Sequence, residues 1–174
     1  MKRRDFVKSG LVTIGTIYLT GCKENLMAEK VDDTPAHLKE IDVDKVDWKA
    51  KTDEYCKSVL SDDQFAICRK ADTERPFSGK YCLSKFSGSY ACACCGQVLF
   101  QSDDKFESGT GWPSFTQSVK DGALTEKVDS SHGMVRTEVL CGRCGAHLGH
   151  VFDDGPPPSH KRFCINSLCL FLRS

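Results

Sequence analysis

Three features that the sequence lacks exclude broad classes of function. Its 174 residues carry 24 basic and 24 acidic side chains, so the formal net charge is zero, whereas a general nucleic-acid binder would carry a basic excess. No glycine-rich dinucleotide fingerprint occurs, which argues against a bound flavin or nicotinamide. The chain has no internal repeat beyond two CxxC pairs, and its length fits one ordinary domain with extensions.

The N-terminal segment predicts export. Residues 2–8 read KRRDFVK, which looks like a twin-arginine signal. The apolar run at residues 10–19 is too short and too interrupted by Gly and Thr to span a bilayer, and it fits the apolar region of a signal peptide. The run ends in LTGC, which looks like a bacterial lipobox with Cys22 as the lipidated residue. An uncleaved anchor or a chance cysteine is the alternative.

This segment sets the predicted domain organisation. We expect a signal peptide over 1–21, a lipidated Cys22 with a flexible tether over 22–45, and one domain over 46–174. Removing residues 1–21 takes away four basic residues and one acidic residue, which leaves 20 basic against 23 acidic and a net charge of −3. The prediction is a lipid-anchored domain in the bacterial cell envelope that faces the periplasm and binds no nucleic acid.

Eleven cysteines are the most unusual abundance in the chain. Such a count indicates metal or catalysis in a cytosolic protein and disulfides in an exported one. Cys92 and Cys95 form one CxxC pair, Cys141 and Cys144 form the other, and the glycine after each pair permits a tight turn. Four thiolates predict a closed, structural zinc site, with Cys94 as a spectator. Two disulfides, or one thioredoxin-type motif, are the alternatives, although neither pair opens a helix in a βαβ pattern.

From residue 46 onward the pattern predicts short helices and then strands. Apolar residues at near-helical spacing predict a helix over Trp48–Val59, and a capping box at residues 61–64 opens a second helix that runs to about Lys70. Residues 153–158, DDGPPP, predict a turn. Many short strands with turn signals favour a sandwich or barrel. The predicted strands cover residues 81–83, 90–92, 98–100, 124–128, 134–140, 147–152 and 162–172.

The segment RFCINS at residues 162–167 carries the strongest signal for chemistry. Side chains alternate along a strand, so Arg162, Cys164 and Asn166 would share one face. A nearby cation favours the thiolate, which is the nucleophilic form of cysteine. A buried structural cysteine is the alternative. Upstream, HLGH at residues 147–150 adds two imidazoles, and GTGWPSF at residues 109–115 adds a rigid aromatic loop.

Together these motifs resemble the methionine-R-sulfoxide reductases, the MsrB family, in matching order from about residue 60 to the C-terminus. The resemblance implies a mainly β (α+β) fold: a small antiparallel sandwich or barrel-like sheet with short N-terminal helices and a structural zinc. It also implies an enzyme that uses a thiol to reduce methionine-R-sulfoxide, protein-bound or free, to methionine through a cysteine sulfenic acid.

The resemblance further implies a role for each site residue. One of the two histidines would protonate the leaving oxygen, and the tryptophan would form the wall against which the methyl group packs. The arginine would help to lower the pKa of the nucleophile, the asparagine would orient the group, and the aspartate would orient the arginine or a histidine. The implied catalytic residues are Cys164 as nucleophile, His147, His150, Asn166, Arg162 and Asp154, and the implied substrate-binding residues are Trp112 and Phe152.

The sequence departs from the family where many relatives carry a resolving cysteine. Thr110 stands at one such position and Ser78 at another. Cys82 lies four residues beyond Ser78 and is the predicted resolver, with Cys68 and Cys56 as further options. Direct attack by an external thiol is the remaining route. We expect a thioredoxin-like reductant, oxidised protein or peptide substrates, and a monomer.

Two rival functions make different demands on the same sequence. A zinc-ribbon binding module that has lost its activity predicts intact CxxC pairs beside a disrupted reactive centre, whereas here the reactive residues are all present. A thiol peroxidase would share a reactive cysteine but would need neither the paired CxxC motifs nor Trp112. Peroxide consumption without sulfoxide would reveal the second rival.

Overall fold

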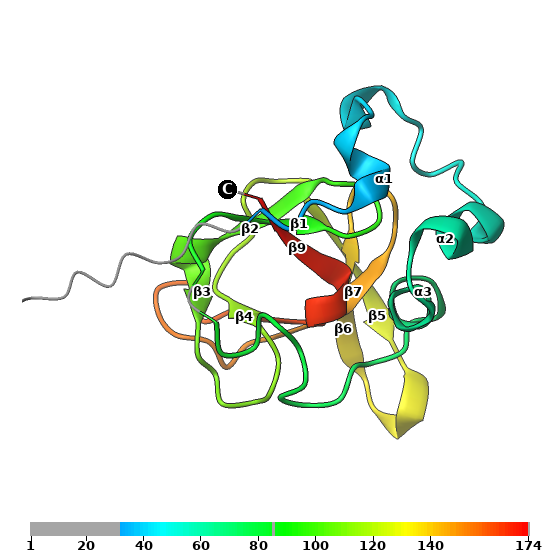
Figure 1. Cartoon of the computed structure of the whole chain (residues 1–174). Helices are drawn as coiled ribbons and strands as arrows, with labels where there is room; N and C mark the ends of the chain where they lie inside the picture. The colour runs from blue at the N-terminus through cyan, green and yellow to red at the C-terminus, as the bar shows by residue number, and fades with distance from the viewer. Residues whose placement is uncertain (1–31, 85, 174) are drawn as a thin grey trace, which may run out of the picture.

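Two antiparallel sheets organise residues 32–84 and 86–173, the part of the chain that the computed structural model describes (Figure 1). The smaller sheet has the order β2-β1-β9, and the larger has the order β3-β4-β8-β7-β6-β5. The strands are β1 (Ser89–Cys92), β2 (Val98–Gln101), β3 (Lys105–Phe106), β4 (Ser114–Phe115), β5 (Leu124–Asp129), β6 (Arg136–Cys141), β7 (His147–Phe152), β8 (Arg162–Ile165) and β9 (Leu170–Arg173). The mainly β fold with short helices is therefore confirmed.

Short helices lie on one side of these sheets (Figure 1). The longest of them, α3, packs against strand β7 and against the 3-10 turn η4, so it supports the back of the larger sheet. The helices are α1 (Ala36–Lys39), α2 (Asp53–Val59) and α3 (Asp62–Lys70), and the 3-10 turns are η1 (Val43–Lys45), η2 (Ser102–Asp104), η3 (Ser131–Gly133) and η4 (Ser167–Cys169).

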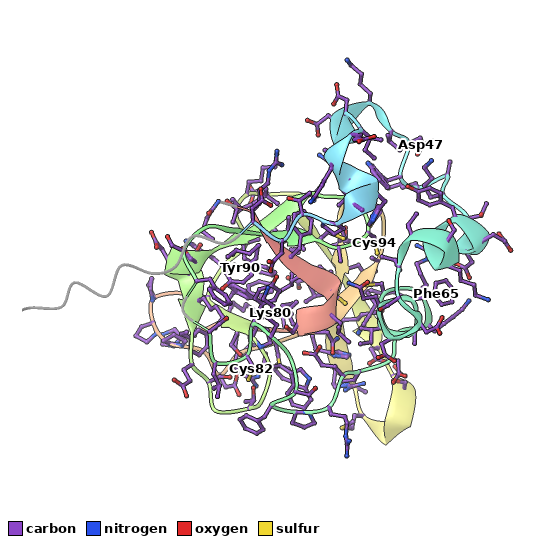
Figure 2. The ribbon with its side chains drawn as sticks, in the orientation of Figure 1. Asp47, Phe65, Lys80, Cys82, Tyr90 and Cys94 are labelled. Atoms are coloured by element: carbon purple, nitrogen blue, oxygen red, sulfur yellow. The ribbon has the colours of Figure 1, made fainter. Side chains whose placement is uncertain are left out.

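Aromatic side chains fill the space between the sheets. Phe100 and Phe115 stack with ring centroids 4.2 Å apart, and Tyr90 meets Phe115 edge-on at 5.1 Å. All three are fully buried, and Tyr90 is labelled in Figure 2. Offset-stacked and edge-to-face pairs are the favoured aromatic geometries. This packing fixes β1, β2 and β4 against one another, and β4 is a direct neighbour of β8.

The predicted second helix is confirmed, and the first begins later than predicted. The Ser61 hydroxyl accepts a bond from the Gln64 amide, and the Gln64 side chain accepts one from the Ser61 amide, which completes the capping box of α3. Helix α2 begins at Asp53, because Thr52 caps it through the amide of Tyr55. Trp48 lies outside the helix and is buried with its indole bonded to a backbone carbonyl.

Part of the predicted tether is packed structure. Leu38 on α1 is buried, and the Asp33 amide donates to the carbonyl of Leu172 at 2.8 Å. Residues 32–45 therefore differ from the prediction of a flexible tether, because one apolar residue and one strand-edge bond hold them on the domain. The predicted signal peptide over 1–21 and the lipidated Cys22 lie outside the described residues.

The strand predictions are correct except at two places. Residues 81–83 form a turn, because the Tyr81 hydroxyl bonds to Asp33 and accepts the amide of Leu172 instead of joining a ladder. The predicted strand over residues 162–172 divides into β8, η4 and β9. Strands β3 and β4 have two residues each, which is too short for an alternating hydrophobic pattern, so the sequence did not predict them. None of the helices in the described part of the chain has the length and apolar character that a membrane crossing requires.

Candidate active site and metal centre

Strand β8 places Cys164 in the middle of the larger sheet. Cys164 pairs with Ser114 on β4 and with His150 on β7. Gly149 makes this close pairing possible, because a Cβ there would lie 2.0 Å from the Cys164 carbonyl oxygen. Directly paired residues of antiparallel strands present their side chains on the same face. The thiol and the His150 imidazole therefore rise from one surface of the sheet.

A β-bulge brings the second histidine to that surface. In a regular strand His147 and His150 would face opposite sides, because they are three residues apart. The pairing passes from Val139–Gly149 to Leu140–His147, so Leu148 is an extra residue in β7. The two imidazole rings then lie with centroids 5.6 Å apart. The bulge therefore places the two imidazoles on the same side of the sheet and in contact with each other.

Each histidine is held by a carboxylate. Glu138 lies 2.7 Å from Nδ1 of His147, and Asp129 lies 2.8 Å from Nε2 of His150. Burial lowers the pKa of His150 below its ordinary value, although the Asp129 carboxylate opposes that shift. Since the ordinary pKa is 6.5, His150 is mainly neutral at pH 7. Its proton then sits on Nε2 beside the carboxylate.

Asp129 also forms an ion pair with Arg136. Its carboxylate accepts bonds from the Ser131 amide and from the Arg136 guanidinium at 2.7 Å, and bonding to Ser131 is the main reason that the pKa of Asp129 is lowered. Asp129 is therefore ionised at neutral pH. Arg136 faces Asp129 directly across the β5–β6 ladder. Sequence reasoning missed Asp129, Glu138 and Arg136, although a hairpin register for residues 124–141 would have paired Asp129 with Arg136.

A cavity of about 120 Å³ opens above the thiol. A water molecule occupies about 30 Å³ in the liquid, so the space suits a small group such as the methyl sulfoxide end of a side chain. Aromatic and apolar surface forms much of its wall, while a thiol, an imidazole, an amide, a hydroxyl-bearing threonine and an arginine supply the polar part. The lining residues are Thr73, Trp112, Arg136, Gly149, His150, Phe152, Cys164 and Asn166.

The thiol of Cys164 is more protonated than the sequence suggested. Arg162 and the Thr110 hydroxyl, 3.9 Å from the sulfur, both act to lower its pKa. Burial is the larger influence and raises the pKa of Cys164 above its ordinary value. The expected direction of the Arg162 effect is correct, but it does not dominate. A thiol that rests protonated needs a base when it reacts.

Asp154 holds the arginine in place. Its two carboxylate oxygens accept bonds from Nε and Nη2 of Arg162 at 2.8 and 2.9 Å. This two-point contact fixes the plane of the guanidinium, which also lies 4.4 Å from the centre of the Phe152 ring. Of the two alternatives for Asp154 stated from the sequence, the structure places it on the arginine. Phe152 thus lines the cavity and also packs its ring against the Arg162 guanidinium.

Glu74 supports the site from behind, and sequence reasoning missed it. Its amide donates to Oδ1 of Asn166 at 3.1 Å, and its carbonyl accepts the indole N–H of Trp112 at 3.1 Å. Its carboxylate accepts the amides of Ser167 and Leu168 at 2.6 and 3.0 Å. Glu74 is 7% exposed, and burial raises its pKa. This one residue therefore connects the asparagine and the tryptophan that line the cavity.

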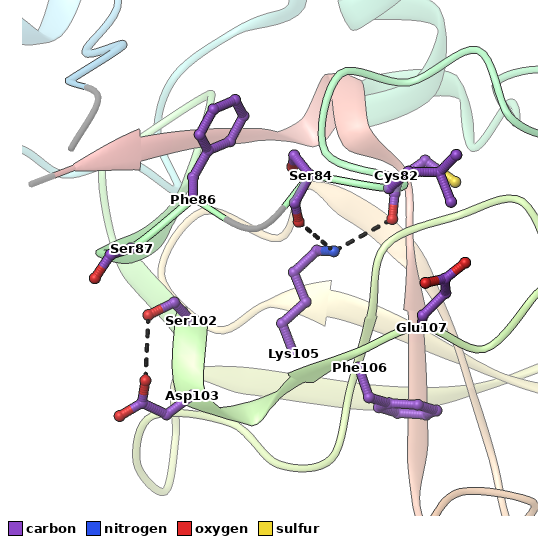
Figure 3. A pocket seen from close by; sticks show the side chains of 10 residues that line it. Cys82, Ser84, Phe86, Ser87, Ser102, Asp103, Lys105, Phe106 and Glu107 are labelled. Carbon is purple, nitrogen blue, oxygen red and sulfur yellow. Dashed lines mark hydrogen bonds between the residues drawn. The ribbon is translucent and has the colours of Figure 1, made fainter. Parts of the chain in front are cut away.

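The predicted resolving cysteine borders a different cavity. Cys82 lines a space of about 300 Å³, in which the ammonium of Lys105 bonds to the backbone oxygens of Cys82 and Ser84 (Figure 3). Within the described part of the chain, the residues lining this space are all different from those around Cys164. Burial raises the pKa of the Cys82 thiol. Cys82 and Cys164 therefore line separate cavities, and both thiols are free.

The four CxxC cysteines converge on one point. Their sulfur atoms all lie within 4.8 Å of one another and all four residues are buried. Two of the separations are 3.8 Å, for Cys92 to Cys144, and 3.6 Å, for Cys95 to Cys141. Sulfurs bound tetrahedrally to zinc at about 2.3 Å would be roughly 3.8 Å apart. The cluster therefore fits a closed structural zinc site, as the sequence predicted.

Two glycines complete the metal centre. Gly96 and Gly145 follow the CxxC pairs with φ of 72° and 71°, a left-handed conformation that favours glycine. Their amides donate to the carbonyls of Cys92 and Cys141 at 2.8 Å in each case. Each turn thus points two sulfurs at one centre, and the predicted role of both glycines is confirmed.

A family model described as the SelR domain matches residues 60–174. The chain is 57% identical over 122 residues to a peptide methionine sulfoxide reductase MsrB from Pseudomonas fluorescens strain Pf0-1, which covers 70% of this chain and 93% of the relative. It is 54% identical over 127 residues to a protein of the same name from Saccharophagus degradans, which covers 73% of this chain and 95% of the relative.

Proposed function

Because the chain belongs to the SelR-domain family of peptide methionine sulfoxide reductases, the MsrB enzymes, we propose that Cys164 is its nucleophile. The enzyme is an oxidoreductase that reduces methionine-R-sulfoxide to methionine. The observation that carries the assignment is the cavity above Cys164, which brings the thiol together with His150, Asn166 and Trp112. In the reaction the Cys164 sulfur attacks the sulfoxide sulfur and takes its oxygen, so the products are a thioether and a cysteine sulfenic acid.

His150 moves the proton that this step requires. Asp129 holds the proton of the neutral imidazole on Nε2, which leaves Nδ1 as a base. The Cys164 thiol rests protonated, because burial raises its pKa, and His150 is its direct neighbour across the β7–β8 ladder. His150 takes the thiol proton as the sulfur attacks and returns it to the sulfoxide oxygen. His147, fixed by Glu138, packs behind it and supports its orientation.

The remaining residues bind and orient. Trp112 and Phe152 supply the apolar wall against which the methyl group packs, and this wall excludes water from the sulfoxide. Asn166 is fixed by the Leu148 carbonyl and the Glu74 amide. Arg162, held by Asp154, stabilises negative charge on the Cys164 sulfur as the proton leaves. The zinc, bound by Cys92, Cys95, Cys141 and Cys144, would stabilise the fold and take no part in the reaction.

The assignment is tested with the separate R and S epimers of a methionine sulfoxide peptide, with dithiothreitol as the reductant. We expect the purified full-length protein to reduce the R epimer only, and Cys164→Ser to lose that activity with its zinc content and circular dichroism unchanged. Reduction of the S epimer, or activity that persists in Cys164→Ser, would contradict the proposal. Peroxide consumption in the absence of sulfoxide would favour the thiol peroxidase.

Recycling proceeds through Cys82 or an external thiol. Thr110 occupies the position at which many relatives carry their resolving cysteine, and its hydroxyl lies 3.9 Å from the Cys164 sulfur. Because threonine has no thiol, a disulfide at this position is impossible. In the first route Cys82, which lines a separate cavity, attacks the sulfenic acid on Cys164 with loss of water, and a thioredoxin-like protein then reduces the disulfide. After one turnover without reductant, we expect a Cys82–Cys164 disulfide that is absent in Cys82→Ser. A sulfenic acid that persists in the wild type until a thiol is added would assign the external route.

The enzyme acts as a monomer on oxidised proteins of the bacterial envelope, tethered by a lipid on Cys22. The support for this location is the twin-arginine-like KRRDFVK and the LTGC that ends the apolar run. In a bacterial host grown with labelled fatty acid, the label should appear on the wild type and be lost in Cys22→Ala. An unlabelled wild-type protein in the soluble cytoplasmic fraction would refute the assignment.

A further inference from the structure

Two buried cysteines outside the site and outside the metal centre lie in direct contact. The sulfurs of Cys68 and Cys169 are 3.4 Å apart. Cys68 is on helix α3 and Cys169 ends the η4 turn, and they are 2% and 0% exposed. Neither belongs to the four-sulfur cluster or lines the cavity around Cys164. The mechanism proposed above uses neither thiol.

This contact is close to the geometry of a covalent bond. A disulfide has a sulfur separation of about 2.04 Å, so the two sulfurs would have to approach by roughly 1.4 Å, a distance that small rotations of two side chains supply. Cys169 also donates to the His147 carbonyl at 3.2 Å. The Cys94 thiol is also within hydrogen-bonding reach of Cys68. It lies between two residues of the zinc cluster, so the pairing of Cys68 with Cys169 is the one that leaves that cluster intact.

We propose that Cys68 and Cys169 are a site of disulfide formation that ties helix α3 to the turn after Cys164. A low-molecular-weight disulfide is the oxidant. When local opening of the fold exposes one of the two cysteines, its thiolate attacks the small disulfide and forms a mixed disulfide with release of one thiolate. The second cysteine then attacks the protein sulfur of the mixed disulfide, and the other small thiolate leaves. Two protein thiols lose two protons and two electrons, and one small disulfide becomes two thiols.

The bond would join segments that the zinc leaves free. The metal cluster closes the chain between residues 92 and 144, which includes neither α3 nor η4. The Cys68–Cys169 bond would close a loop of 101 residues, and cross-links of long loops restrict the unfolded chain most. The bond would also hold together the two segments that Glu74 connects. Glu74 follows α3, and its carboxylate accepts bonds from the amides of Ser167 and Leu168 in η4.

The first measurement is a peptide map of the oxidised protein. The zinc-loaded full-length protein is equilibrated with glutathione disulfide or with dithiothreitol, alkylated, unfolded, digested and analysed by mass spectrometry. We expect a Cys68–Cys169 peptide pair in the oxidised sample only, with the zinc content measured before unfolding unchanged by the oxidation. Complete alkylation of Cys68 and Cys169 after oxidation and unfolding, or a bond from Cys68 to Cys94, would overturn the proposal.

Unfolding in urea with zinc present gives a second readout. Oxidation should lower the unfolding equilibrium constant of the wild type about a hundredfold, and Cys68→Ala and Cys169→Ala should each lose this dependence. Cys56→Ala is the matched control, because Cys56 is a buried thiol on α2, and it should retain the full effect. An equal response of Cys68→Ala and wild type to oxidation would contradict the proposal.

The proposal stands apart from the catalytic assignment. In Cys164→Ser the Cys68–Cys169 bond should form as in the wild type, because Cys164 is neither its oxidant nor its partner. That variant also removes the reactive thiol, so glutathione cannot accumulate there and complicate the map. A bond that forms in the wild type and is absent in Cys164→Ser would instead make the pair part of the catalytic cycle, and would refute an independent cross-link.

Discussion

The metal centre and the reactive centre are both built around cysteine, but they are assembled in different ways. Each pair of metal-binding sulfurs comes from one CxxC turn closed by a glycine. The reactive centre instead draws on a strand, a bulge, a loop and a buried carboxylate that are far apart in the sequence. The first site depends on local turn geometry, and the second depends on the completed fold.

The two centres also differ in the electrostatic environment of their sulfurs. Cys164 is only partly buried, beside one cation and one hydroxyl, and lines an open cavity. The CxxC sulfurs face one another inside the protein with no open position, which is the arrangement of a structural zinc. We therefore expect changes at the reactive centre to alter the chemistry at nearly constant stability, and changes at the metal centre to do the reverse.

The largest effect is expected from Cys164, the proposed nucleophile. Cys164→Ser replaces a sulfur nucleophile by a hydroxyl that stays protonated at neutral pH, and we expect kcat to fall by at least about a thousandfold. The free energy of unfolding should change by less than about 1 kcal/mol. Single-turnover reduction of the R sulfoxide and urea unfolding measure the two quantities. A large loss of stability in this variant would break the contrast between the centres.

The metal centre should give the opposite result. Cys141→Ser removes one of four buried ligands, and we expect loss of zinc and a decrease in the free energy of unfolding of more than about 3 kcal/mol. The fraction that remains folded at low temperature should keep most of its activity per molecule. Zinc content, urea unfolding and activity normalised to folded protein test this. Stability that is unchanged after the metal is lost would show that the cluster is not structural.

The contrast between the two centres also decides which parts of the molecule could be predicted from the sequence. The CxxC pairs, the α3 capping box and the strand at residues 147–152 are local patterns, and the structure confirms each of them. The MsrB resemblance is likewise confirmed by the family model and the relatives. The strand predicted at residues 81–83 was wrong, because contacts with distant Asp33 and Leu172 decide its conformation.

The support of the reactive centre could not be predicted for the same reason. Glu74 lies in a loop whose own sequence shows no need for a buried carboxylate, and its partners are more than 90 residues away, at Ser167 and Leu168. The net rise in the pKa of Cys164 is a result of burial, which alternation along one strand does not reveal. The sequence indicated that Arg162 lowers the pKa of Cys164, but it did not indicate the burial that raises this pKa.

Glu74 provides a test between the two centres, since it is buried like a structural residue yet serves the site. Glu74→Gln keeps the shape but loses a charged acceptor, so we expect the free energy of unfolding to fall by about 2 kcal/mol. The carboxylate bonds to the Ser167 and Leu168 amides and so anchors the Glu74 backbone, which contacts Trp112 and Asn166. Because weaker anchoring would loosen these backbone contacts, KM should rise severalfold. Steady-state kinetics and urea unfolding measure both, and Glu74→Asp is the control that keeps the charge. An unchanged KM would show that Glu74 stabilises the fold but does not support the substrate site.

The pH dependence tests the role of His150. Its pKa is lowered by burial, so the neutral form is favoured in the folded state. The stability that this shift contributes is therefore present above pH 6.5 and is lost as the pH falls through the lower, folded pKa. Because the neutral imidazole is the proposed base, kcat/KM should decrease on the acid side with an apparent pKa below 6.5.

Asp129→Asn sharpens this test. The Asp129 carboxylate raises the pKa of His150 and Arg136 lowers it, so removing the carboxylate should move the acid limb of the profile further down, by about one pH unit. Glu126→Gln is the control, because it removes a carboxylate from the same strand at an exposed position. A limb that moves upward in Asp129→Asn would assign the titration to a group other than His150.

The smallest effect belongs to Thr110, whose hydroxyl lies 3.9 Å from the Cys164 sulfur and also meets Ser108 at 2.9 Å. This hydroxyl acts to lower the pKa of Cys164, so Thr110→Val should raise that pKa by a few tenths of a unit and slow the reaction two- to fivefold, on the order of one lost hydrogen bond. Thr110→Ser keeps the hydroxyl and should behave as the wild type. Thiol alkylation rates measured against pH give the pKa directly. Because Thr110 is not one of the residues of the four-sulfur cluster, a change in zinc content in Thr110→Val would show that the two centres are coupled.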